Sequence, residues 1–164
     1  MKQHLISLVL FFSFLLSGCM PLKQTEVTSP NGHIRLAFAL DGNNRMTYQV
    51  SVGDTVCITS SLLGFTAKDG VNLAEGFKVI NTDFTTHDET WTQPWGENKN
   101  IRNHYNEMAV HLSDTTNTKL TLRFRIFDDG LGFRYEYEVP GADSILVTDE
   151  LTAFNIAQDG TSWS

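Results

Sequence analysis

The 164-residue sequence predicts an all-β protein built as an antiparallel β-sandwich. Three observations predict this fold class. Apolar and polar residues alternate along several short segments, as they do in strands with one buried face. Gly, Asn and Asp residues that favour turns separate these segments, and no window keeps the i, i+3, i+4, i+7 apolar spacing of a helix beyond one turn. Several short strands at close spacing are typical of two packed antiparallel sheets.

The first expected strands form an antiparallel meander. Residues 34–40 alternate large apolar residues with Arg and Ala, and residues 46–52 repeat the alternation. Between them, Asp41-Gly42-Asn43-Asn44 supplies turn residues that tolerate positive φ. A second turn at Gly53-Asp54 leads into a third strand at residues 55–59.

Four further strands are expected after residue 76. Residues 77–81 predict a strand with both faces partly covered, and residues 104–112 a longer one. Residues 120–126 and 131–139 alternate on either side of Asp128-Asp129-Gly130, which predicts a hairpin. Its polar faces are expected to place arginines opposite glutamates, and exposed pairs of this kind contribute about 0–1 kcal/mol each.

The first eighteen residues predict a lipoprotein signal peptide. A short polar start precedes an apolar run from Leu5 to Leu16, which as a helix is about 18 Å long and too short for roughly 30 Å of bilayer hydrocarbon. The sequence Leu16-Ser17-Gly18-Cys19 resembles the bacterial lipobox and predicts that Cys19 carries the lipid. An ordinary secretory signal with an incidental cysteine is the alternative.

This assignment divides the chain into a signal peptide (1–18), a tether (19–28) and one domain (29–164). It predicts a periplasmic lipoprotein of the Gram-negative envelope, held on the outer membrane through its lipid alone. Cys57 is then the remaining thiol, and its apolar neighbours Val56 and Ile58 predict a small buried hydrophobic residue.

Charge and composition exclude several classes of protein. Twelve basic and 19 acidic residues leave a net charge of −7, which argues against binding nucleic acid or docking on anionic lipid through charge. A hydrophobic content of 41% is too high for a disordered chain. Two cysteines supply neither a disulfide framework nor a zinc site, and the histidines have no metal-ligand spacing. No metal site is predicted in this chain.

The most unusual segment begins at Trp91 and ends at Glu107. It concentrates aromatic, amide and charged side chains, which stack on sugar rings and bond sugar hydroxyls. The alternative is structural: Trp95 closes the end of the sandwich, and Arg102 pairs with Glu107. Glu97 and Glu107 are not selected as a hydrolytic pair, because 19 acidic residues leave the choice open. The candidate contact residues are Trp95, Glu97, Arg102, Asn103, His104, Tyr105 and Glu107.

Four motifs carry a resemblance to a known family. They are Ser29-Pro30-Asn31-Gly32, Pro94-Trp95-Gly96-Glu97, the run from Ile101 to Glu107, and the run from Phe124 to Tyr135. In this order they resemble the N-terminal part of glycoside hydrolase family 97, and they cover nearly all of the chain after the signal peptide.

The resemblance implies a galactose-mutarotase-like β-supersandwich that precedes a (β/α)₈ catalytic barrel. Family members act on α-glucosides or α-galactosides in the cell envelope, chiefly in Bacteroidetes. Their two catalytic carboxylates and a calcium ion belong to the barrel, so the resemblance assigns no catalytic residue here and implies calcium only in the full-length enzyme. The chain alone is expected to be inactive and its sandwich truncated.

The function expected from the sequence is therefore that of a non-catalytic, carbohydrate-associated domain. It would pack on the C-terminal barrel and shape the mouth of its pocket, with no nucleic-acid partner. We expect the segment from Trp95 to Glu107 at the edge that faces the barrel, with Trp95 or Tyr105 exposed in the chain alone. A free-standing glycan-binding envelope lipoprotein without hydrolase activity is one alternative, and a fragment with no stable fold is another.

Overall fold

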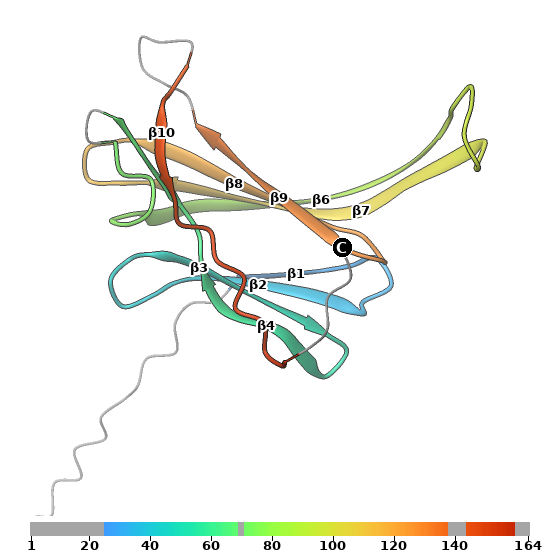
Figure 1. Ribbon diagram of the computed structural model, residues 1–164, viewed down its shortest axis with the longest axis horizontal. Helices are drawn as coiled ribbons and strands as arrows, with labels where there is room; N and C mark the ends of the chain where they lie inside the picture. The colour runs from blue at the N-terminus through green and yellow to red at the C-terminus, as the bar shows by residue number, and fades with distance from the viewer. Residues whose placement is uncertain (1–24, 69–70, 138–143, 160–164) are drawn as a thin grey trace, which may run out of the picture.

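The computed structural model describes residues 25–68, 71–137 and 144–159, and there it is all-β (Figure 1). The predicted antiparallel β-sandwich is confirmed, and no α-helix occurs in these ranges. The strands are β1 (Thr25–Thr28), β2 (Ile34–Leu40), β3 (Met46–Val52), β4 (Thr55–Leu62), β5 (Phe65–Ala67), β6 (Lys78–Thr92), β7 (Asn100–Ser113), β8 (Lys119–Ile126), β9 (Leu131–Tyr137) and β10 (Val147–Glu150).

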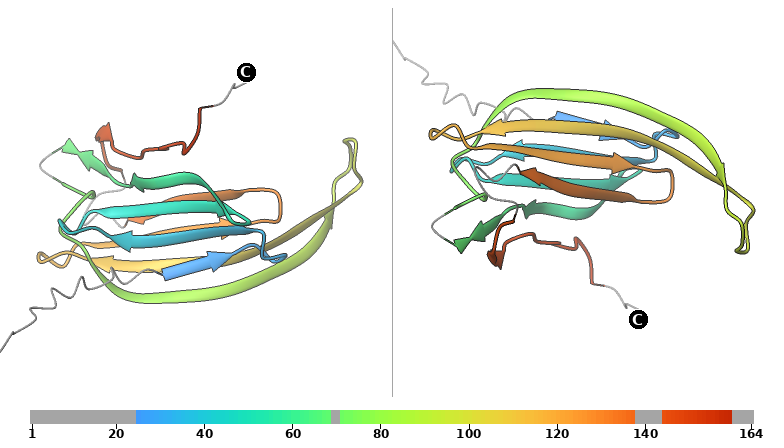
Figure 2. Two further views of the ribbon diagram at one scale, coloured as in Figure 1. Left: turned by 90° about the horizontal axis from the view of Figure 1, so that it is seen from below. Right: turned by 90° about the horizontal axis from the view of Figure 1, so that it is seen from above.

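Two four-stranded antiparallel sheets make the sandwich. One has the order β1-β2-β3-β4 and the other the order β6-β7-β8-β9, so each follows the chain as a meander. Figure 2 shows the two sheets lying face to face, with the β6–β7 hairpin continuing well beyond them. A small sheet of β5 and β10 joins segments that are about eighty residues apart in sequence.

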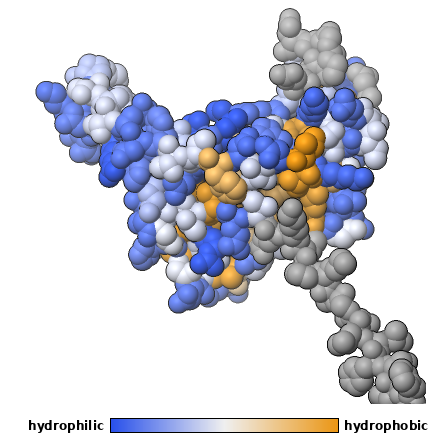
Figure 3. Space-filling view, turned by 180° about the vertical axis from the view of Figure 1, so that it is seen from behind, coloured by the Kyte–Doolittle hydropathy of each residue, from blue (hydrophilic) through white to orange (hydrophobic). Residues whose placement is uncertain are grey.

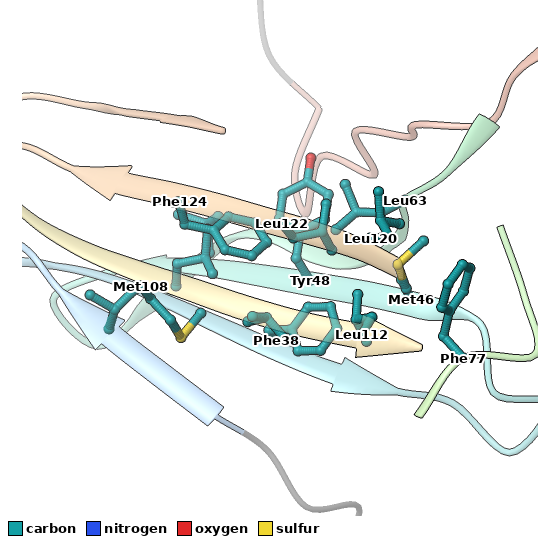
Figure 4. Packing of buried hydrophobic residues seen from close by; sticks show 14 of the residues in the cluster. Phe38, Met46, Tyr48, Leu63, Phe77, Met108, Leu112, Leu120, Leu122 and Phe124 are labelled. Carbon is teal, nitrogen blue, oxygen red and sulfur yellow. The ribbon is translucent and has the colours of Figure 1, made fainter. Parts of the chain in front are cut away.

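The core lies between the inward faces of the two large sheets (Figure 4). The ring of Phe38 on β2 lies 6.1 Å from that of Phe124 on β8, and the ring of Tyr48 on β3 lies 5.6 Å from that of Phe133 on β9. Alternate residues of each strand point inward, and burying them is the main driving force for this fold. The largest fully buried side chains are those of Tyr48, Phe38, Phe77, Phe124, Leu36, Met46, Leu63, Leu73, Met108, Leu112, Leu120 and Leu122.

The strands predicted by strict alternation agree with the structure. β2 and β3 have the expected bounds, and β4 extends three residues further than expected, to Leu62. The hairpin of β8 and β9 is also confirmed, but the expected opposition of Arg to Glu is wrong in detail. Arg123 lies directly opposite Arg134, and Glu136 bonds to both from a neighbouring position on the same face.

The prediction for β6 is wrong in length and burial. The alternation predicted a strand at residues 77–81 with both faces partly covered, whereas β6 covers Lys78–Thr92 and is almost entirely exposed. Apart from Phe84 and Trp91, residues 82–92 are polar on both faces, so they have no period-two pattern of hydrophobicity that would reveal a strand. β7 likewise begins at Asn100, four residues before the expected start.

The expected tether is also corrected in part, because residues 25–28 form β1. This strand pairs antiparallel with β2, and Val27 is buried against the core. The side-chain amide of Asn106 on β7 donates a hydrogen bond to the carbonyl of Thr28 at 2.9 Å, which joins β1 to the opposite sheet. The signal peptide, Cys19 and the rest of the tether lie outside the described residues.

Two tyrosines tie the C-terminal segment to the sandwich. The hydroxyl of Tyr48 donates to the carbonyl of Ala153 at 2.9 Å, and the hydroxyl of Tyr135 forms a hydrogen bond of 2.6 Å with that of Thr152. Burial raises the pKa of both hydroxyls above the usual value. The segment after β10 therefore lies along β4 as an irregular edge, where Thr59 and Ala157 also form backbone hydrogen bonds.

Cys57 is half-buried near that edge rather than fully buried, which corrects the prediction for this thiol. It lies on β4, whose outward residues contact solvent on one side. Strands β5 and β10 were not predicted, since they are only three and four residues long. No helix within the described ranges has the length and apolar character needed to cross a membrane.

Candidate functional site

The candidate residues gather on the projecting part of the β6–β7 hairpin. Pairing between β7 and β8 stops at Asn106, whereas pairing between β6 and β7 continues to Thr92 and Asn100. Residues 87–105 therefore form a two-stranded ribbon, which we call the arm; it curves away from the sandwich in Figures 1 and 2. A two-stranded ribbon without a third strand is marginally stable in water, so its cross-strand contacts matter.

Polar side chains join the two strands of the arm. The guanidinium of Arg102 donates two hydrogen bonds of 2.8 Å to the carboxylate of Asp88, and Asn103 donates to Glu89 at 3.0 Å. The hydrogen bonds from Arg102 lower the pKa of Asp88. His104 lies directly opposite Asp88 in the register.

The tip of the arm exposes tryptophan to solvent. The side chain of Trp95 is 84% exposed and that of Trp91 is 48% exposed. The side-chain amide of Gln93 donates to the carbonyl of Asn98 at 2.6 Å and closes the loop that also carries Glu97. The structural alternative for Trp95, that it closes the end of the sandwich, is therefore wrong.

Tyr105 lies at the base of the arm and is buried, although it is on the outward face of its sheet. Its ring stacks on that of His87 at 5.0 Å and packs against that of Phe127 at 5.2 Å. The guanidinium of Arg125 lies 4.7 Å from the ring centroid, which is within the range of a cation–π contact. The expectation that Trp95 or Tyr105 is exposed thus holds for Trp95 alone.

Glu107 forms an ion-pair network on the outward face of β7, β8 and β9. Its carboxylate accepts hydrogen bonds from Arg123 and from Nε of Arg125, the latter at 2.7 Å. Burial by itself would raise the pKa of Glu107, but these two bonds outweigh it and keep the pKa below the usual value. The local pairing of Arg102 with Glu107 is therefore wrong, since each has another partner.

Arg123 extends this network to Glu136 on β9. It donates to that carboxylate through Nε at 2.7 Å, and Arg134 donates to the same carboxylate. These bonds, that from Arg123 above all, lower the pKa of Glu136 to about 2. The alternation around Asp128-Asp129-Gly130 already predicted arginines and glutamates together on this face, but sequence reasoning missed that Glu107 of β7 joins them.

Glu97 and Glu107 do not form a hydrolytic pair. Glu107 pairs with Thr85 in the middle of the hairpin, whereas Glu97 lies in the loop beyond Asn100. Glu107 is seven positions along β7 from Asn100, which corresponds to about 24 Å at the rise of an antiparallel strand. Glycoside hydrolysis needs two carboxyl groups about 5–10 Å apart, so these two carboxylates cannot act on one bond.

The described residues do not fit the calcium ion that the resemblance implies for a full-length enzyme. Within residues 25–68, 71–137 and 144–159, no three His, Cys, Asp or Glu side chains gather in a way that would hold a metal ion. The carboxylates of Asp88 and Glu107 are already paired with arginine. No chemical step is assigned to calcium here.

The depressed pKa of Glu136 predicts a loss of stability in acid. A carboxyl with a folded pKa of about 2, against a usual 4.5, stabilises the fold above about pH 4.5 and loses that contribution as the pH falls toward 2. Urea unfolding should therefore show a falling free energy of unfolding between about pH 5 and pH 2.5. Glu136→Gln should flatten this dependence, and an equally steep dependence in the variant would contradict the prediction.

Comparison with known proteins finds a matching family and a curated relative. The family described as Glycosyl-hydrolase 97 N-terminal matches residues 27–164. A curated relative, the retaining alpha-galactosidase of Bacteroides thetaiotaomicron, is 24% identical over 140 residues, which are 85% of this chain and 20% of the relative.

Solved structures agree with that match. A glycoside hydrolase family 97 enzyme from Pseudoalteromonas sp. strain K8, in complex with panose, has a TM-score of 0.75 and 30% identity over 81% of this chain and 20% of its own. A beta-arabinopyranosidase has a TM-score of 0.73 and 25% identity over 80% of this chain and 21% of its own. The chain thus spans about one fifth of the length of these relatives.

Proposed function

This chain belongs to the glycosyl-hydrolase 97 N-terminal family, and on that premise we propose that it is the non-catalytic domain of an α-glycosidase. It packs on a separate catalytic barrel and shapes the mouth of the pocket, where an α-glucoside or α-galactoside binds. The retaining alpha-galactosidase and the enzyme that binds panose support a carbohydrate substrate of this class. The pairing of Glu107 with two arginines supports a non-catalytic role for its carboxylate.

The exposed tryptophans on the arm are the observation that carries this proposal. Trp91 and Trp95 lie on a ribbon that no other strand of the described chain supports. Arg102, on the same ribbon, is held in a fixed position by Asp88. Trp and Arg are the residues that interfaces enrich at their centres, and an exposed aromatic on an extended arm is typical of a docking element.

The arm gives the first test of the proposed function. The full chain is joined at Ser164 to the part of the Pseudoalteromonas enzyme that lies outside the matched fifth, and turnover of an aryl α-glucoside is measured. Trp95→Ala should lower kcat/KM about tenfold or more, because hot-spot aromatics in interfaces commonly contribute about 2 kcal/mol or more. In the free chain the same change should alter the free energy of unfolding by no more than about 0.5 kcal/mol.

Leu146→Ala is the matched control, since this side chain is 64% exposed but lies far from the arm in sequence, next to β10. It should leave kcat/KM of the joined protein unchanged. Equal activity of the Trp95→Ala protein and its parent would contradict docking through the arm. A joined protein that is folded but inactive would contradict the proposal that this domain packs on a catalytic barrel.

Attachment to the cell envelope through Cys19 belongs to the same proposal. The lipobox-like sequence Leu16-Ser17-Gly18-Cys19 supports it. Expression in a Gram-negative host with a radiolabelled fatty acid should yield a labelled protein in the outer-membrane fraction, and Cys19→Ser should abolish both labelling and processing. Cys57→Ser is the control and should be labelled like the parent. Labelling that survives Cys19→Ser would exclude this anchor.

A further inference from the structure

The two large sheets are offset from each other by one strand. β1 lies against β7 through the bond from Asn106 to Thr28, and β2 lies against β8 through Phe38 and Phe124. β3 lies against β9 through the rings of Tyr48 and Phe133. The first sheet therefore has no described strand opposite β6, which extends past β1 at this side of the sandwich.

A groove follows this side between β1 and β6. One hollow of about 510 Å³ lies between Thr25 and Leu40 on the first sheet and residues 78–82 of β6. A second hollow of about 340 Å³ lies between residues 26–28 of β1 and residues 84–86 of β6. The two hollows follow each other along β1 and β6, and we call them together the β1–β6 groove.

Apolar side chains line the groove without cover. Phe84 is 56% exposed and pairs in register with Met108, which is fully buried in the core. Val79 is also exposed and pairs with the buried Leu112. The inward face of β6 therefore continues the core face of β7, but no strand of the first sheet within the described residues covers it. Figure 3 shows hydrophobic side chains gathered on this face of the molecule, between hydrophilic surroundings.

Both strands that border the groove have a free edge within the described part of the chain. β1 pairs only with β2, and β6 pairs only with β7 along all of its 15 residues. A long unpaired edge is a site for aggregation, and folded proteins normally cover it or pair it. One additional strand would cover the apolar face of β6 and form hydrogen bonds with the free edge of β1.

We propose that the β1–β6 groove receives a β-strand from the part of the full-length enzyme outside this chain. The strand pairs with the free edge of β1 as a fifth strand of the first sheet, about 4.8 Å from β1 and about 10 Å above β6. Its inward residues are apolar and cover Phe84 and Val79. This inference rests on the proposed function and deepens it, because it assigns a second contact besides the arm.

The rest of the enzyme is a better occupant than a second copy of this chain. The relatives are about five times as long as the part that this chain matches, so a full-length enzyme has ample polypeptide for the additional strand. Two copies paired through β1 would share only its four residues, at the short end of the range for strands, and the second β1 would leave most of the 15-residue β6 uncovered.

Amide hydrogen exchange tests the proposal on the full chain, free and joined at Ser164 to the remainder of the Pseudoalteromonas enzyme. In the joined protein, amides of residues 25–28 and 78–84 should exchange more slowly than in the free chain, by a factor of about ten or more. Phe84→Lys should remove this protection in the joined protein. Val52→Lys should retain it, since Val52 is 45% exposed but lies at the end of β3.

Each outcome is decisive. Because Phe84 and Val52 are both exposed, neither variant should change the melting temperature of the free chain by more than a few degrees. Protection that appears in the free chain and rises with its concentration would identify a second copy as the occupant and overturn the proposal. An active joined protein in which the groove exchanges as fast as in the free chain would overturn this inference and leave the proposed function standing. An inactive joined protein without protection at the arm or groove would overturn both.

Discussion

Phe124→Ala is expected to lower the free energy of unfolding of this chain by about 3–5 kcal/mol. Phe124 is fully buried at the middle of β8, and its ring packs against Phe38 at 6.1 Å and Phe133 at 5.8 Å. Removing the ring loses the free energy gained when it leaves water, and it leaves a cavity between the sheets that rigid strands cannot close. Because a domain of this size is stable by only about 5–15 kcal/mol, a substantial fraction of the stability would be lost.

Urea unfolding followed by circular dichroism measures this effect. Phe124→Leu is the graded control: it keeps much of the apolar volume, so its cost should be clearly smaller than that of Phe124→Ala. Trp95→Ala removes a larger side chain from a site that is 84% exposed, yet should cost no more than about 0.5 kcal/mol. If Trp95→Ala destabilised the free chain as much as Phe124→Ala, Trp95 would belong to the core.

Glu107→Gln is expected to cost about 2–3 kcal/mol, the second largest effect. The carboxylate is buried and accepts bonds from two guanidinium groups, those of Arg123 and Arg125. A neutral amide keeps the shape but cannot balance two positive charges, and hydrogen bonds to charged groups contribute about 1.5–3 kcal/mol. Arg123 retains Glu136 in the variant, which limits the loss.

Glu89→Gln is the matched control for this variant. Glu89 is on the same face of the hairpin and accepts a hydrogen bond from Asn103, but it is exposed, so the change should have no measurable effect. The difference between Glu107→Gln and the parent should shrink as the pH falls below the usual carboxyl value of 4.5, because the unfolded parent takes up a proton at Glu107 before the folded parent does. A difference that stays constant down to about pH 2.5 would show that charge is not the cause.

The strands with one buried face were predictable from the sequence. β2, β3, β8 and β9 alternate large apolar residues with polar ones, because one side faces the core and the other faces solvent. The turn at Asp128-Asp129-Gly130 fixed the place of the second hairpin. The family could also be recognised from the sequence, because its motifs are local runs of residues that do not depend on tertiary contacts.

The segment that carries the candidate site was predictable from the sequence, but the contacts and exposure of its side chains were not. The crowding of Trp, Arg, His and amide groups between Trp91 and Glu107 is visible in the sequence, and the arm contains most of that segment. Whether a given aromatic side chain is exposed depends on whether side chains from other strands pack over it. Tyr105 is buried because Phe127 and Arg125, some twenty residues away, fold over it, whereas Trp95 has no such neighbours.

The sequence by itself therefore determined the fold class, the meander of β2 to β4, the hairpin of β8 and β9, and the family. Only the tertiary structure decided the length of β6, the partners of Glu107 and the offset that leaves the β1–β6 groove open. The physical reason is that alternation reports a strand only where one face is buried. Polar strands, ion pairs between distant strands and the stacking of sheets depend on register and packing, which arise from contacts far apart in the chain.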